Sequence, residues 1–291
     1  MGNAHHRRGR QAPLRHHADA DDPVIDVQGH RGARGYLPEN TLPAFARALE
    51  LGVSTLELDV GVTRDGIVVI HHDRGLNPDI ARGPDGQWVE HAVPIHALTY
   101  AELQRYDVGR LRPGSGYARG FAHQQPLDGT RIPRLADLFQ LTESNRTIRF
   151  NIEPKMDAAA LDETLPAAQF ARALISEVRK ARLQDRTTVQ AFYWPVLKVV
   201  EREAPEMPTV YCTEGALSDP ERARAAGARI WSPDYQTVSP DKLAAARREG
   251  MKVTVWTVNE PADIERMLAM GVDGIASDYP DRVLAQLKGK R

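Results

Sequence analysis

Short apolar runs alternate with longer segments of helical periodicity from residue 23 onward. In several places a helical segment ends at a glycine and an apolar run follows directly; these glycines are Gly52, Gly227, Gly250 and Gly271. Glycine adopts the left-handed conformation beyond a helix C-terminus at little cost, so each is predicted to end a helix. Helix starts are predicted at Ser239 and at Thr99, which has Glu102 at the capping-box spacing. Alternating β and α units predict a parallel sheet, either closed into a barrel or doubly wound.

Nine apolar runs are predicted to be strands, at residues 24–29, 54–60, 67–72, 147–153, 187–192, 208–213, 228–232, 253–258 and 274–277. Polar residues gather at the C-terminal ends of these runs: His30, Glu57, Asp59, His72, Glu153, Lys155, Asp234, Asn259 and Asp278. This edge carries the site in barrels and in open sheets, but a doubly wound sheet uses fewer strands. The pattern therefore predicts a distorted (β/α)8 TIM barrel in which one strand is an irregular extra element.

Two regions depart from this rhythm. Residues 74–131 are rich in glycine and proline and contain one predicted helix, at 99–106. We interpret them as an insertion after the third strand-like segment, lying over the mouth of the barrel. Residues 1–22 are first basic and then acidic, and we expect a disordered tail there. The barrel domain then comprises residues 23–291.

The run at 54–60 carries the first candidate chemistry. Side chains alternate along a strand, so Glu57 and Asp59 share one face while the leucines between them share the other. In a barrel the leucines must face the helices, which turns both carboxylates inward. Two like charges in such a place are costly unless a cation neutralises them. The alternative for this segment alone is a strand with one solvated face.

A hairpin is predicted directly after this strand. Asp65 and Gly66 stand between apolar runs, and the connection is too short for a crossover helix. A two-residue loop at these positions pairs Asp59 with His72 and places both side chains on one face. The prediction is therefore that His72, rather than His71, meets the carboxylates. A shift of register by one residue would favour His71 instead.

Two other strand ends supply further groups. His30 and Arg31 follow the first strand, where a histidine can transfer a proton and an arginine can bind phosphate with two hydrogen bonds. Glu153 and Lys155 share one face of a later strand and are candidates for a third carboxylate ligand and a phosphate contact; the alternative is a solvent-facing ion pair. Three carboxylates, without a second cysteine or a His-x-x-x-His pair, favour a hard ion such as Mg²⁺ or Ca²⁺ over Zn²⁺.

The composition excludes several classes of function. The 291 residues are 42% apolar and 26% charged, as in an ordinary globular protein, and the net charge of −1 argues against nucleic-acid binding. Cys212 is the single cysteine, so no internal disulfide is expected. No apolar run reaches the length of a membrane span, and no signal peptide is recognisable. We therefore expect a cytoplasmic protein, or a periplasmic or secreted one if the true start lies upstream; no feature assigns an oligomeric state.

Several motifs occur in order along residues 28–280: HRG, PENT, ELDV, VVIHHD, IEPK, TVWTVN and DGIASDYP. This set resembles the glycerophosphodiester phosphodiesterase family, within the PLC-like phosphodiesterases. The resemblance implies a distorted (β/α)8 barrel and metal-dependent hydrolysis of glycerophosphodiesters, its small-molecule partners, to glycerol 3-phosphate and an alcohol.

Carried over by position, the resemblance also implies roles for single residues: His30 and His72 as the acid/base pair, Glu57, Asp59 and Glu153 as ligands of Mg²⁺ or Ca²⁺, and Arg31 and Lys155 as phosphate contacts. Trp256, within TVWTVN, is assigned to substrate binding, although an aromatic residue on a strand often belongs to the core.

Other functions are compatible with the same residues. A phospholipase-D-like or phosphoinositide-cleaving enzyme would keep the site and change the substrate, but no basic or amphipathic membrane-facing segment is recognisable. A non-catalytic phosphodiester binder would not need two histidines together with three carboxylates. A metal-dependent isomerase would require a lysine base, for which Lys155 is the candidate.

Overall fold

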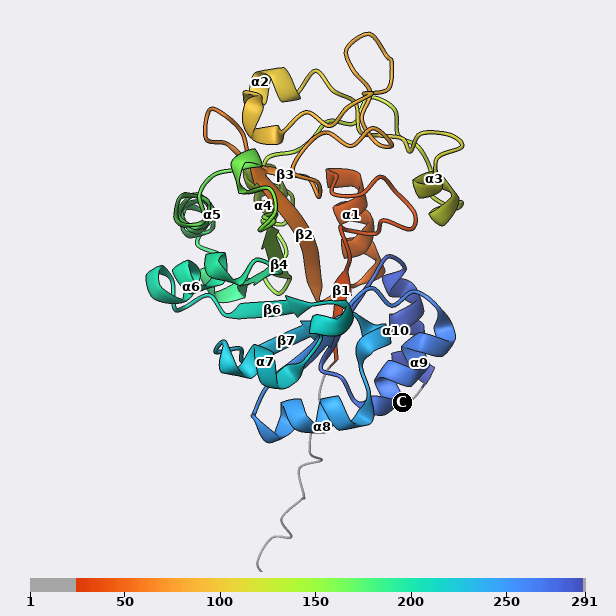
Figure 1. Ribbon diagram of the computed structural model, residues 1–291. Helices are drawn as coiled ribbons and strands as arrows, with labels where there is room; N and C mark the ends of the chain where they lie inside the picture. Colours follow the sequence, from red (N-terminus) through yellow and green to blue (C-terminus); the bar gives the residue numbers. More distant parts are fainter. Residues whose placement is uncertain (1–24, 290–291) are drawn as a thin grey trace, which may run out of the picture.

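The computed structural model describes residues 25–289, in which one sheet of nine strands forms the centre of the molecule (Figure 1). Eight strands run parallel: β1 (Asp26–Gly29), β2 (Thr55–Val62), β4 (Arg149–Pro154), β5 (Thr187–Ala191), β6 (Thr209–Thr213), β7 (Ile230–Pro233), β8 (Lys252–Val255) and β9 (Gly274–Ser277). The sheet closes because β1 pairs with both β2 and β9. The predicted barrel is confirmed, and the nine predicted strands are all present within the described residues. The tail predicted at 1–22 lies outside them.

Helices follow the strands and pack around the barrel (Figure 1). They are α1 (Leu42–Leu51), α4 (Leu135–Leu141), α5 (Ala167–Lys180), α6 (Trp194–Glu203), α7 (Pro220–Ala225), α8 (Pro240–Arg248), α9 (Pro261–Met270) and α10 (Pro280–Gly289). The predicted helix ends are confirmed: Gly52 after α1 has φ 90° and Gly271 after α9 has φ 76°. The predicted caps are present too, since the Ser239 hydroxyl accepts a hydrogen bond from the Lys242 N–H at the start of α8.

The predicted hairpin is present, but its predicted register is wrong by one residue. Strand β3 (Val68–Ile70) runs antiparallel to β2 and pairs Ile70 with Val60. The Thr63 N–H donates to the Ile67 carbonyl at 3.0 Å, which leaves a three-residue loop whose last residue, Gly66, has φ 82°. A type I turn closed by a left-handed glycine takes one residue more than the two-residue loop assumed from Asp-Gly.

The register shift does not bring His71 into the site. The His71 N–H still donates to the Asp59 carbonyl at 3.0 Å, but its ring is buried and lies 3.3 Å from the Gly75 carbonyl. His72 follows after the strand has ended, so the strand alternation no longer sets its direction. Its side chain lies at the barrel mouth beside Lys155.

Residues 74–131 contain short helical turns and no strand of the sheet: η1 (Ile95–Ala97), α2 (Tyr100–Leu103) and α3 (Gly116–Gly120). The helix predicted at 99–106 is α2, which begins with the predicted capping box at Thr99 and Glu102. A small apolar cluster that includes Leu76, Ile95 and Leu103 holds the segment together, separate from the main core. The segment lies beside α1 and β3 (Figure 1), where it contacts the loop between β1 and α1.

The core lies between the sheet and the helices, and it determines which side chains enter the barrel. Leu56, Leu58 and Val60 on β2 have no exposed surface and belong to the main apolar cluster. The alternation along the strand then sends Glu57 and Asp59 to the inside of the barrel. Burial of the apolar side chains therefore orients both acidic side chains, although the two carboxylates repel each other.

Core packing should dominate the stability of this barrel. Leu174 on α5 has no exposed surface and belongs to the main cluster, whereas Leu161 is 41% exposed. We expect Leu174→Ala to lower the free energy of unfolding by about 2–5 kcal/mol, because a cavity replaces buried methyl groups. The matched control Leu161→Ala should change it by less than about 0.5 kcal/mol. Urea denaturation measures both, and equal losses in the two variants would contradict this assignment of the core.

Candidate active site

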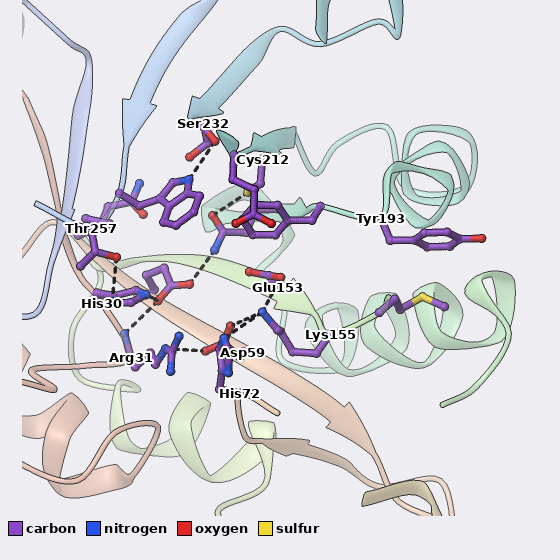
Figure 2. A pocket seen from close by; sticks show the side chains of 18 of the residues that line it. His30, Arg31, Asp59, His72, Glu153, Lys155, Tyr193, Cys212, Ser232 and Thr257 are labelled. Carbon is purple, nitrogen blue, oxygen red and sulfur yellow. Dashed lines mark hydrogen bonds and ion pairs between the residues drawn. The ribbon is translucent and has the colours of Figure 1, made fainter. Parts of the chain in front are cut away.

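A cavity of about 600 Å³ opens at the carboxyl ends of the barrel strands (Figure 2). It is lined by residues from most of the strands and from the segments that follow them, among them His30, Arg31, Arg34, Glu57, Asp59, His72, Glu153, Lys155, Gln190, Phe192, Cys212, Ser232 and Trp256. Six of the residues that the sequence singled out at strand ends therefore meet in one place, as expected for the catalytic face of a (β/α)8 barrel, whereas Asp234, Asn259 and Asp278 are not among the lining residues.

Three buried carboxylates form the floor of this cavity. Glu57 and Asp59 come from β2, and the register between β2 and β4 sets Glu153 beside Asp59. Their exposed fractions are 2%, 2% and 6%, and one oxygen from each lies within 4.8 Å of the others. Side chains and one backbone group hold them in place: the Gln190 amide donates to Glu57 at 2.6 Å, the Asn40 amide donates to Asp59 at 2.9 Å, and the Arg31 N–H donates to Glu57 at 2.9 Å.

The electrostatics of these carboxylates favour a bound cation. Burial, together with the charge of Asp59, raises the pKa of Glu57 well above its ordinary value, and burial also raises the pKa of Glu153. The Lys155 ammonium lies 2.8 Å from Glu153 and 3.6 Å from Asp59, so it balances part of this charge. A cluster that offers only oxygen ligands, all from carboxylates, suits a hard divalent ion. The three residues therefore fit a divalent metal.

His30 lies directly after β1, and the carboxylate of Asp278 contacts its ring. Its Nδ1 is 2.7 Å from Asp278, and its Nε2 is 3.9 Å from Glu57. Burial, together with the charge of Arg34, lowers the pKa of His30 from 6.5 to about 4. The ring is therefore neutral near pH 7, and the contact with Asp278 favours the proton on Nδ1, which leaves the Nε2 lone pair facing the carboxylates.

His72 lies at another edge of the same cluster. Its Nδ1 is 2.8 Å from Asp73, and the Lys155 ammonium donates to its Nε2 at 3.2 Å (Figure 2). His30 approaches the carboxylates from the side of Glu57, whereas His72 approaches through Lys155 from the side of Glu153 and Asp59. Two imidazoles thus flank one acidic cluster from different elements of the fold.

The loop between β1 and α1 places a guanidinium over the cluster. Arg31 has φ 52°, a left-handed conformation that turns its N–H toward Glu57. Its Nε lies 3.4 Å from Asp59, and its Nη1 donates to Glu39 at 2.9 Å. Lys155 and Arg31 therefore bring two positive charges to the cavity, in which an anionic group would be attracted to both.

Trp256 lines the cavity and also packs within the barrel. Its indole N–H donates to the Ser232 carbonyl at 3.0 Å, and its ring meets Phe192 edge to face at 5.3 Å. The assignment of Trp256 to substrate binding stays a prediction. Cys212 is buried, and burial raises the pKa of its thiol well above the ordinary value.

Some residues of the site were not predicted. Asp278 was noted as a strand end but not assigned to His30, and Arg34, Glu39, Asn40 and Gln190 were not singled out. Glu39 and Asn40 lie within the PENT motif, so a signal for them was available. Gln190 lies on a predicted strand at an inward position, where the alternation could have indicated it. Asp278 could not have been paired with His30 without the closed barrel, because 248 residues separate them.

The fold and the site define a (β/α)8-barrel enzyme with its active site at the carboxyl ends of the strands. Residues 30–282 match the model of the glycerophosphoryl diester phosphodiesterase family. The chain therefore belongs to this family and is a phosphoric diester hydrolase.

Individual relatives agree with this assignment. A glycerophosphodiester phosphodiesterase of Caldanaerobacter subterraneus subsp. tengcongensis is 29% identical over 259 residues, which cover 89% of this chain and 96% of the relative. A crystal structure from Silicibacter pomeroyi DSS-3, provisionally assigned as a glycerophosphoryl diester phosphodiesterase, is 37% identical with a TM-score of 0.87 and covers 92% of this chain and 94% of that one.

A more distant structure shares the fold. An Oleispira antarctica phosphodiesterase, solved in complex with the product sn-glycerol-3-phosphate, is 22% identical with a TM-score of 0.73, covering 91% of this chain and 97% of that one. Within residues 25–289, none of the helices is both long and apolar enough to cross a membrane.

Cation binding by the acidic cluster should be visible as stabilisation. We expect Mg²⁺ or Ca²⁺, added to chelator-treated protein at a hundredfold excess over Kd, to raise Tm by about 5 °C, since an ion that binds only the folded state stabilises it. Thermal unfolding followed by circular dichroism measures this shift. Glu153→Gln should abolish it, whereas Glu50→Gln on the exposed face of α1 should leave it unchanged. A shift of the same size in Glu153→Gln would argue against the cluster as the site.

Proposed function

We propose that this enzyme hydrolyses glycerophosphodiesters to sn-glycerol 3-phosphate and an alcohol, with Mg²⁺ or Ca²⁺ held by Glu57, Asp59 and Glu153, and with His30 and His72 in acid/base roles. The observation that carries the proposal is the convergence of both histidines on the buried carboxylate cluster in one cavity. The Oleispira antarctica phosphodiesterase was solved in complex with the product sn-glycerol-3-phosphate, which supports this product for the present enzyme.

The substrate phosphate is expected to lie above the carboxylate cluster. A divalent ion held there would neutralise negative charge that develops on the phosphoryl oxygens. Arg31 and Lys155 would bind the remaining phosphate oxygens, Arg31 through N–H groups along an edge of its planar guanidinium and Lys155 as a point charge. Trp256 would bound the space for the glycerol or the alcohol, since its ring lines the cavity beside Phe192.

The environments of the two histidines suggest different tasks. His30 is neutral at pH 7 and its Nε2 carries a free lone pair, so it is suited to take a proton from the nucleophile. Asp278 would orient the ring and stabilise the imidazolium that forms. In its imidazolium form, with Nδ1 held by Asp73 and Lys155 turned from Nε2 to the phosphate, His72 would then give its Nε2 proton to the leaving alkoxide from the other side of the phosphate and be left neutral. The nucleophile in this scheme is water or the neighbouring glycerol hydroxyl, and either gives up its proton to His30.

The reaction class can be tested with one substrate. We expect the protein to release glycerol 3-phosphate from glycerophosphocholine. It should lose this activity in EDTA, because the cluster would no longer hold an ion, and regain it when Mg²⁺ or Ca²⁺ is added back. A coupled glycerol 3-phosphate assay measures the release.

Each outcome of this assay has a meaning. Restoration by one ion only would identify the metal. Full activity in EDTA would refute the metal dependence. Absence of glycerol 3-phosphate release from glycerophosphocholine and glycerophosphoethanolamine, together with absence of head-group release from a lysophospholipid, under either ion, would overturn the proposed function.

The roles of the histidines predict a loss of turnover without a loss of structure. We expect His30→Ala and His72→Ala each to lower kcat by about 10²–10⁴-fold, the range typical of a lost general acid or base. His91→Ala provides a matched control, because His91 is exposed and lies in the insertion. Steady-state kinetics measures the loss of turnover, and circular dichroism checks that the structure is retained. A near-native kcat in His30→Ala would exclude an acid/base role for His30.

A further inference from the structure

Helix α3 of the insertion approaches the active site through a tyrosine. The helix spans Gly116–Gly120, and the Ser115 hydroxyl caps its start by accepting a hydrogen bond from the Ala118 N–H. None of its five residues is fully buried, so burial of an apolar face does not explain its position. Tyr117 points from α3 toward the loop between β1 and α1, where the arginines of the site lie.

Tyr117 makes hydrogen bonds to three charged side chains of that loop. Its hydroxyl donates to the Glu39 carboxylate and accepts from Arg31 Nη1 at 3.3 Å and from Arg34 Nη1 at 3.1 Å. The side chains of both arginines are 10% exposed and that of Glu39 is 4% exposed, so solvent screens these contacts little. Burial and the neighbouring Glu39 raise the pKa of Tyr117, so the phenol keeps its proton and can donate it.

The other contacts of this segment converge on the same loop. The Phe121 ring lies 4.5 Å from the Arg34 guanidinium and 5.5 Å from the Tyr117 ring. The Gln124 amide donates to the Arg34 carbonyl at 2.8 Å. The insertion is thus attached to the barrel mouth at the residues that carry its positive charge, and Arg34 receives contacts on both its side chain and its backbone.

Both arginines turn their other edges toward the cavity. Arg31 Nη1 is held by Glu39 and Tyr117, while Arg31 Nε lies over the carboxylate cluster, 3.4 Å from Asp59. Within residues 25–289, that Nε is buried and makes no hydrogen bond. Arg34 donates from Nε and Nη2 to Asp278, which in turn contacts His30. The Tyr117 hydroxyl therefore contacts the Nη1 atom of each guanidinium, while other nitrogens of the same groups lie toward Asp59 and Asp278.

We propose that Tyr117 is a positioning residue through which the insertion orients Arg31 and Arg34 and so sets the affinity of the site for a phosphate ester. This inference rests on the proposed function, because it takes the cavity to be the phosphate site. A guanidinium binds phosphate through hydrogen bonds of fixed direction, so a rotation of its plane weakens binding. Loss of the Tyr117 hydroxyl leaves Arg31 Nη1 with one anchor, Glu39, and removes the hydroxyl that accepts a hydrogen bond from each arginine, so that Glu39 alone, 3.6 Å from Arg34 Nη1, still contacts both.

The test compares Tyr117→Phe with the wild type in the presence of Mg²⁺. We expect Kd for sn-glycerol 3-phosphate, measured by calorimetry, to rise about tenfold, the size typical of a lost hydrogen bond to a charged group. KM for glycerophosphocholine should rise in parallel while kcat stays within about twofold, since an interaction equal in ground and transition states affects binding alone. Tyr106→Phe is the matched control, because Tyr106 also packs in the insertion and makes no side-chain hydrogen bond within residues 25–289.

A double variant separates positioning from a general effect on the fold. In an Arg31→Lys background, Tyr117→Phe should raise Kd less than threefold, because Arg34 is then the only one of the two planar groups left for it to orient. A tenfold rise in that background would overturn the coupling, and so would an unchanged Kd in Tyr117→Phe, whatever its Tm.

The same titrations distinguish the two proposals. A wild type that binds sn-glycerol 3-phosphate but cleaves no glycerophosphodiester would overturn the proposed function and leave the role of Tyr117 standing if the variant shows the expected rise. A wild type that does not bind sn-glycerol 3-phosphate would overturn the role of Tyr117, because the arginines would then form no phosphate site.

Discussion

The mutual repulsion of three buried carboxylates is the constraint on which the mouth of this barrel depends. Glu57, Asp59 and Glu153 are brought together by burial of the apolar residues that alternate with them, so the core creates the repulsion. It is balanced locally: Lys155 and Arg31 supply positive charge, and Gln190 and Asn40 donate hydrogen bonds. The cluster still has more negative than positive charge after this compensation, and such a cluster of carboxylate oxygens is suited to bind a divalent cation.

The loop between β1 and α1 connects this cluster to the rest of the site. Its Arg31 contacts both carboxylates of β2, and Arg34 binds Asp278 beside His30. Burial alone would raise the pKa of Asp278, but Arg34 and His30 hold it below its ordinary value. Asp278 therefore stays ionised and keeps the His30 ring oriented. One short loop thus links the acidic cluster, a histidine and, through Tyr117, the insertion, and these contacts are the route by which the insertion would influence phosphate affinity.

Much of the fold followed from local patterns. The nine strands, the helix ends at glycine and the capping box at Thr99 were predicted because each depends on neighbouring residues alone. The inward direction of Glu57 and Asp59 followed from the two-residue period of a strand. The hairpin shows the limit of such reasoning: Asp-Gly correctly indicated a turn, but the length of the loop, and with it the register, depended on backbone conformation at Gly66.

The sequence by itself determined the candidate carboxylates and histidines of the site, because their residue types and their places at strand ends are readable along the chain. Only the tertiary structure decided how they are paired. Asp278 meets His30 across the closure of the barrel, His72 reaches Lys155 after its strand has ended, and Tyr117 reaches Arg31 from the insertion. These contacts join residues 83 to 248 positions apart. Periodicity assigns a side chain to a face of its own element, whereas a partner on a distant element is set by how the elements pack.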